Sequence, residues 1–177
     1  MHKQATDWVS HSFHLWRGSK TDLNILEIGS LDINGSVRPI FLPYQLTYLG
    51  IDPQEGPGVD LVTDASTFVT GPKFDVVVCA EVFEHTAVWR DIIDRTYDNL
   101  VDGGLFIATM AGIGRHPHSA IDENPIRDWE YYENVSYSDL SSALVKFKEF
   151  KVNVLGNDTR CWAVKGNELT NIEKEVK

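Results

Sequence analysis

The sequence LNILEIGSLDING, residues 23–35, decides the fold of this chain. Its first part is a short apolar run, which is typical of a buried parallel strand rather than of a helix. Glu27 lies at the end of this run, and Gly29 then permits positive φ and close backbone approach. Ligands bind at the carboxyl ends of strands in open α/β sheets, so the stretch predicts a ligand-binding loop. An ordinary strand-to-helix turn is the alternative.

The composition predicts one globular domain over residues 1–177, with 42% hydrophobic and 24% charged residues. A formal net charge of −10 disfavours nucleic acid as a partner, because such binding relies on Lys and Arg contacts to phosphates. The chain has no apolar run of about 18 residues and no apolar core of a signal peptide near its start. We therefore expect no membrane segment and a cytoplasmic protein.

The two cysteines, Cys79 and Cys161, both lie in apolar runs that read as strands. A small buried hydrophobic residue is the expected role for each, rather than a disulfide or a thiol nucleophile.

Acidic residues end two further predicted strands. Residues 46–52, LTYLGID, end at Asp52 followed by Pro53, and a third short strand ends at Asp64. Asp52 lies 23 residues after Gly29, close to the offset of roughly 20 at which an acid meets a nucleoside ribose in dinucleotide folds. A helix cap or Asx turn is the alternative for Asp52. If the three strands are parallel, all three acids lie along one rim of the sheet.

The remaining pattern alternates helices and strands. Apolar residues at helical spacing predict an N-terminal helix over residues 5–16 and a second helix over residues 86–100. The run FDVVVCA, residues 74–80, predicts a central parallel strand, and residues 105–110 predict the next one. A last helix over residues 139–145 precedes two alternating runs that predict an antiparallel pair.

This order of elements resembles the class I S-adenosylmethionine-dependent methyltransferases over roughly residues 23–164. The resemblance rests on LEIGS, GID, the third acid and AEVFEH, which follows the central strand. It implies an α/β, Rossmann-like, doubly wound fold in three layers. The sheet would have seven strands, mostly parallel, with an antiparallel last strand.

The resemblance also implies which residues bind the cofactor. LEIGS resembles the motif beside the methionine part, Asp52 the ribose-binding acid, and Asp64 the residue at the adenine edge. The implied cofactor-binding set is Glu27, Gly29, Ser30, Asp52, Pro53, Asp64, Ala65, Ala80 and Glu81. The loop departs from the family pattern, because Leu31 and Asp32 stand where further glycines are often found.

The charge of this rim fits the same cofactor without the resemblance. The sulfonium of S-adenosylmethionine is cationic, so Glu27, Asp32 and Asp52 would attract it, whereas they would repel the pyrophosphate of a dinucleotide.

His85, at the end of AEVFEH, is the predicted catalytic residue, because a histidine has the pKa range of a general base. A histidine that only holds the start of a helix is the alternative.

Residues 111–138 form a long polar and aromatic segment, which predicts a lid or substrate loop. Its candidate acceptor-binding residues are Arg115, His116, His118, Tyr131 and Tyr132. The two histidines with Asp122 could also bind a metal, but a solvated loop is favoured and no metal is predicted.

The sequence therefore predicts a methyltransferase that acts on an oxygen or nitrogen of a small-molecule acceptor. A non-catalytic S-adenosylmethionine-binding or scaffold domain is the first alternative. A nicotinamide-nucleotide oxidoreductase is the second.

Overall fold

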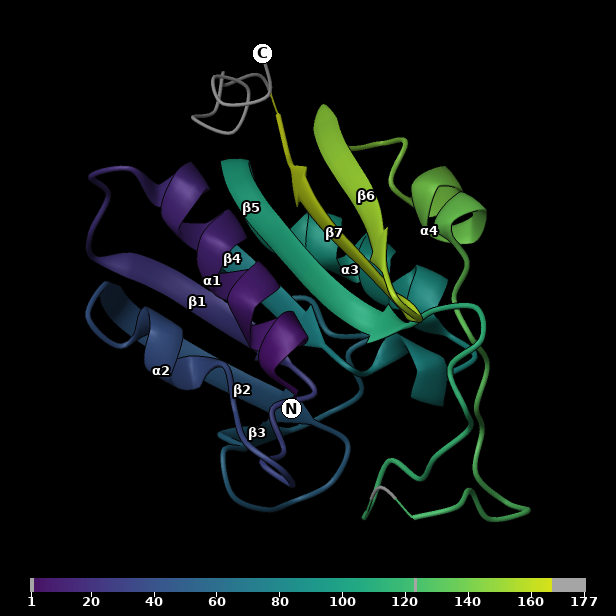
Figure 1. Ribbon diagram of the computed structural model, residues 1–177. Helices are drawn as coiled ribbons and strands as arrows, with labels where there is room; N and C mark the ends of the chain where they lie inside the picture. Colours follow the sequence, from purple (N-terminus) through teal and green to yellow (C-terminus); the bar gives the residue numbers. More distant parts are fainter. Residues whose placement is uncertain (1, 123, 167–177) are drawn as a thin grey trace.

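The computed structural model describes residues 2–122 and 124–166 and shows three layers (Figure 1). Its sheet has seven strands in the order β3-β2-β1-β4-β5-β7-β6. The strands are β1 (Leu23–Ile28), β2 (Gln45–Asp52), β3 (Leu61–Val62), β4 (Phe74–Ala80), β5 (Leu100–Ala111), β6 (Glu149–Leu155) and β7 (Asp158–Val164). Pairing is parallel from β3 through β5, and β7 runs antiparallel to both β5 and β6. The predicted fold class is confirmed.

Helices cover both faces of the sheet (Figure 1). On one face, α1 (Lys3–Arg17) and the single turn of α2 (Arg38–Phe41) share a core cluster with alternate residues of β1, β4 and β5. On the other face, α3 (Trp89–Asn99) and α4 (Tyr137–Ala143) pack on the intervening residues of the same strands. Side chains alternate between the two faces of a strand, so strands that are apolar throughout supply both cores.

The helix predicted from residue 86 begins three residues later, at Trp89. Phe83–His85 form a separate 3₁₀ turn, η1, and Thr86 is then extended, with φ −144° and ψ 132°. An extended residue cannot continue a helix, so the AEVFEH segment becomes a turn at the end of β4.

The strand predicted from residue 105 instead begins at Leu100. Gly103, at φ +76°, lies within it, and the pairing with β4 shifts register between Phe74 and Val76. The Asp-Gly-Gly sequence that reads as a helix end is therefore an irregularity inside β5.

Two smaller predictions need similar adjustment. The third strand is confined to Leu61–Val62, although it pairs in parallel with β2 as expected. The last helix begins at Tyr137 rather than at residue 139, because the Ser136 hydroxyl caps it by accepting from the Asp139 amide at 3.1 Å.

Other predictions agree with the structure. Cys79 and Cys161 are buried and are not in a disulfide. The charged tail after Gly166 lies outside the described residues. Within residues 2–122 and 124–166, the structure contains no helix with the length and apolar character needed to cross a membrane.

Candidate functional site

A cavity of about 760 Å³ opens at the carboxyl ends of the parallel strands. Its volume lies within the range of roughly 300–1,000 Å³ found for small-molecule and cofactor sites. All nine residues that the sequence predicts for cofactor binding line this cavity. They come from the ends of β1, β2 and β4 and from the segment after β3, as parallel strands predict.

The loop after β1 is held between Ile51, at the end of β2, and Val82, which follows β4. The amides of Gly29 and Ser30 donate to the Ile51 carbonyl oxygen at 2.9 and 3.1 Å. Gly29 has φ +73°, and a Cβ atom at this position would lie 2.2 Å from Cγ2 of Val82. Only glycine can adopt this positive φ and lie this close to Val82 without strain. The backbone of this loop therefore reaches the cavity wall.

Glu27 is a buried acid in the cavity wall, with 5% of its surface exposed. The Tyr48 hydroxyl donates to its Oε2 at 2.8 Å. Burial raises the pKa of Glu27 from its ordinary 4.5 to about 7, although the hydrogen bond from Tyr48 opposes this rise. The carboxyl therefore changes charge near neutral pH.

Asp52 forms the Asx turn that was the alternative considered for it. Its Oδ1 accepts from the Gln54 amide at 2.9 Å, as in an Asx turn, and its Oδ2 accepts from the Leu31 amide at 3.3 Å. Each oxygen keeps acceptor capacity for a ligand hydroxyl. Asp64 is exposed at the cavity and accepts from the Ser66 amide at 2.8 Å.

Glu81 follows β4 with a left-handed backbone, φ +58°, which is uncommon for a residue with a side chain. Its amide donates to the Thr109 carbonyl at 2.7 Å, and its carboxylate lies 3.3 Å from Nε2 of His2. His2 also lies 3.4 Å from Asp158 and lines the cavity. The sequence gives no signal for His2, because its partners are remote in the chain.

The same cavity is also lined by His85, Arg115, His116 and His118, which we call the acceptor side. Arg115 forms an ion pair with Asp158. The structure does not place the two predicted tyrosines among the residues that line the cavity. The Tyr131 hydroxyl bonds to Glu133 instead, while Tyr132 packs behind the acceptor side, with its ring centroid 5.5 Å from that of His85 and 5.1 Å from that of His118.

The metal site considered from the sequence, with His116, His118 and Asp122 as ligands, does not form. Asp122 pairs with Arg127 at 2.5 Å, and no grouping of Asp122 with His116 and His118 occurs in the described parts of the chain.

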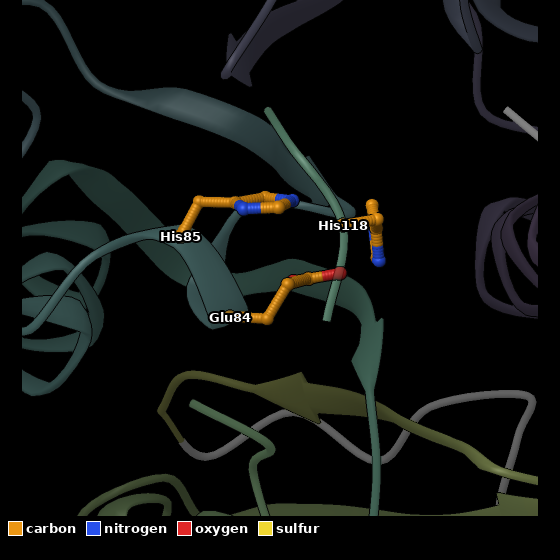
Figure 2. Close-up of side chains that lie close together, drawn as sticks. All are labelled: Glu84, His85 and His118. Carbon is orange, nitrogen blue, oxygen red and sulfur yellow. The ribbon is translucent and has the colours of Figure 1, made fainter. Parts of the chain in front are cut away.

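Glu84 is a site residue that sequence reasoning missed. It is fully buried, its Oε1 accepts from the Ala111 amide at 3.0 Å, and its carbonyl accepts from the Glu133 amide at 2.9 Å. Burial and the charge of Glu81 raise the pKa of Glu84. Its side chain points toward His118 and lies beside His85 (Figure 2). The only signal for it in the sequence is an acid that follows the apolar residues Val82 and Phe83 in AEVFEH.

His85 has a neutral ring at pH 7. Burial, followed by the neighbouring His118, lowers the pKa of His85 from its ordinary 6.5 to about 4. A ring with this pKa accepts a hydrogen bond readily but holds a proton poorly.

The comparisons with solved structures agree with this architecture. The YcgJ protein from Bacillus subtilis gives a TM-score of 0.69 at 13% identity, covering 94% of this chain and 100% of that one. The 1,6-didemethyltoxoflavin-N1-methyltransferase from Burkholderia thailandensis gives 0.69 at 12% identity, covering 92% and 79%. The N-methyltransferase NodS from Bradyrhizobium japonicum gives 0.60 at 17% identity, covering 94% and 100%. At these identities the likeness concerns the fold.

Comparison with curated proteins found no match. A family model described as a methyltransferase domain matches residues 2–166, nearly the whole chain. The chain therefore belongs to this methyltransferase-domain family, and its fold is that of the class I S-adenosylmethionine-dependent methyltransferases.

Proposed function

We propose that this protein transfers the methyl group of S-adenosylmethionine to an oxygen or nitrogen of a small-molecule acceptor. The observation that carries the proposal is the composition of one cavity. The nine predicted cofactor-binding residues form what we call the cofactor wall, which comes from four segments at the ends of parallel strands, and the acceptor side lines the same cavity. A cofactor and an acceptor bound there would share one enclosed space.

The charge of the cofactor wall supports a cationic cofactor. Glu27 and Asp52 are both buried at this wall, and no basic residue comes from the loops after β1 and β2 into the lining. A sulfonium is attracted to such a wall, whereas a pyrophosphate is repelled. In this proposal Asp52 binds the ribose hydroxyls, Glu27 and Gly29 border the methionine part, and Asp64 with Ala65 contacts the adenine.

Methyl transfer requires mainly that the acceptor atom is aligned with the methyl group of the cofactor. Bound S-adenosylmethionine would supply the methyl group: the acceptor's lone pair would form the new bond to the methyl carbon, the carbon–sulfur bond would break with its electrons on sulfur, and the proton of the acceptor would pass to water. His85 is our candidate for contact with the acceptor. Its neutral ring can accept a hydrogen bond from a hydroxyl or amine and so direct the lone pair toward the methyl group.

A small-molecule acceptor fits the size of the cavity and the net charge of −10. One structural neighbour was solved with 1,6-didemethyltoxoflavin and S-adenosylhomocysteine bound, and another is a plantazolicin methyltransferase. Arg115, His116 and His118 are placed to contact the acceptor here.

Calorimetric titration with S-adenosylmethionine, S-adenosylhomocysteine and NAD tests the cofactor. We expect binding of both sulfur compounds and none of NAD. Absence of binding by either sulfur compound would overturn the proposal. Screening of metabolites with S-adenosylmethionine that carries a deuterated methyl group then separates an enzyme from a binding domain, since only an enzyme yields labelled products.

The variant His85→Ala tests the acceptor side. We expect it to lose turnover while it keeps the wild-type affinity for S-adenosylmethionine. Full turnover in this variant would assign His85 a purely structural role.

A further inference from the structure

Two side chains of the acceptor side, His85 and His118, and the buried Glu84 beside them converge on one point (Figure 2). Glu84 and His85 are consecutive in η1, and His118 comes from the long loop between β5 and α4. One potential ligand atom from each residue lies within 4.8 Å of those of the other two. His118 lies more than 30 positions after Glu84 and His85 in the sequence, so the cluster exists only in the folded chain.

The Glu84 carboxylate is incompletely bonded. Its Oε1 accepts from the Ala111 amide, but its Oε2 is buried and has no hydrogen-bond partner among the described residues. A buried carboxylate oxygen without a partner is costly, so native structures usually supply one. Figure 2 shows this carboxylate directed at His118, which donates no hydrogen bond to it in the described structure.

His118 is oriented by a second contact. Its Nδ1 lies 3.2 Å from the His116 carbonyl oxygen. With a proton on Nδ1 this contact is a donated hydrogen bond, and Nε2 keeps a free lone pair. Histidines that bind metals commonly have their other ring nitrogen fixed by a carbonyl in this way.

We propose that Glu84, His85 and His118 bind a divalent transition-metal cation through one carboxylate oxygen and two imidazole nitrogens. Imidazole is a ligand suited to Zn²⁺, Fe²⁺ or Co²⁺, whereas Ca²⁺ and Mg²⁺ prefer sites made only of oxygen. The nearby Glu81 adds negative charge that favours a cation. The alternative is a purely structural cluster, in which the His85 and His118 rings pack edge to face at 5.0 Å.

The geometry requires the three side chains to move closer together. Bonds from such ions to nitrogen measure about 2.1 Å, so two ligands at a tetrahedral angle around one ion lie about 3.4 Å apart. Ligand atoms at the 4.8 Å limit would therefore approach each other by about 1.4 Å. Both histidines are only half-buried and border the cavity, so their rings have room for this adjustment.

Three protein ligands leave coordination positions open toward the cavity. This step of the inference rests on the proposed function: the ion would bind an oxygen of the acceptor next to the cofactor. A hydroxyl held there loses its proton to water more easily, and its oxygen then attacks the methyl carbon as the bond to sulfur breaks. The inference therefore favours an acceptor with a hydroxyl group.

Titration of the full chain with CoCl₂ and with ZnCl₂, followed by calorimetry, tests the site directly. We expect one ion per chain and a visible absorption band for the bound Co²⁺. Glu84→Gln keeps an acceptor for the Ala111 amide, and His118→Ala changes only a loop side chain. Removing the hydrogen-bond partner of a metal ligand already lowers metal affinity by roughly tenfold. Each of these variants removes a ligand itself, so its metal affinity should fall by at least that factor.

Two histidine variants serve as controls. His116→Ala removes an exposed ring two positions away in the same loop, and His11→Ala removes an exposed ring on α1. Both should bind Co²⁺ as the wild type does. Equal Co²⁺ affinity in the wild type, Glu84→Gln and His118→Ala would overturn the inference, as would a loss confined to His11→Ala.

The same samples are titrated with S-adenosylmethionine. Retained binding shows that the variants are folded, so a loss of Co²⁺ affinity reports on the metal site alone. Failure of the wild type to bind S-adenosylmethionine would instead count against the proposed function and leave the metal result standing.

Discussion

The Tyr48 hydroxyl on β2 donates a hydrogen bond of 2.8 Å to Oε2 of Glu27 on β1. This bond favours the ionised carboxyl, whereas burial opposes ionisation more strongly, and the pKa of Glu27 is raised to about 7. A titrating acid therefore lies in the wall of the cofactor cavity.

Glu27 should make stability depend on pH. Its pKa in the folded chain, about 7, lies above the ordinary 4.5, so its contribution is complete below pH 4.5 and is lost as pH rises through 7. Relative to Glu27→Gln, the wild type should lose about 3 kcal/mol of unfolding free energy between about pH 4.5 and about pH 8.5. Urea denaturation at both pH values measures this. A difference between the two proteins that does not change with pH would contradict it.

The affinity for the cofactor should also depend on the ionisation of Glu27, but it should increase with pH, whereas the stability decreases. Ionised Glu27 attracts the cationic cofactor, so affinity for S-adenosylmethionine should rise by up to about tenfold from about pH 6 to about pH 8, with nearly one proton released on binding at about pH 6 and almost none at about pH 8. Calorimetry in two buffers with different ionisation enthalpies measures both quantities. Glu27→Gln should bind more weakly and lack the rise. An equal rise in that variant would assign the effect to another group.

Asp52→Ala should weaken S-adenosylmethionine binding by about 1–3 kcal/mol, because charge-assisted hydrogen bonds to the ribose are lost. Asp52→Asn removes the charge but keeps one acceptor oxygen, which can serve the shorter of the two bonds, that from the Gln54 amide. Asp7→Asn, an exposed acid on α1, is the control for net charge. Unchanged affinity in Asp52→Ala would refute the ribose role.

Gly29→Ala should destabilise the fold by at least about 1–2 kcal/mol, the cost of a left-handed conformation in a residue with a side chain. The added methyl also collides with Val82. Gly71→Ala is a matched control, since a Cβ atom there meets nothing within 4 Å. Thermal melting of both variants measures the contrast. The double variant Gly29→Ala with Val82→Ala should recover part of the loss, because it removes the collision and leaves the backbone strain.

The cofactor wall was predictable from the sequence because it follows from topology. Glu27, Asp52 and Asp64 each end a strand or follow one, and parallel strands bring such residues to one edge. A short motif near each strand end therefore carries most of the information about that wall.

The acceptor side was less predictable, because its residues are placed by an irregular loop. His118 enters the cavity, whereas Tyr131 turns outward to Glu133, and no periodicity distinguishes the two. The role of Glu84 depends on complete burial, which the packing of distant segments produces. His2 reaches the cavity through contacts with Glu81 and Asp158, more than 70 positions away.

The long loop begins and ends at one place in the fold. The Val135 amide donates to the Ala111 carbonyl at 2.9 Å, and the Gly112 amide donates to the Asn157 carbonyl at 2.8 Å. Doubling the length of a flexible loop between fixed ends costs only about 0.6 kcal/mol. We expect that other loops grafted between Ala111 and Val135 would change the acceptor that this protein takes, while the sheet and the cofactor wall stay as they are.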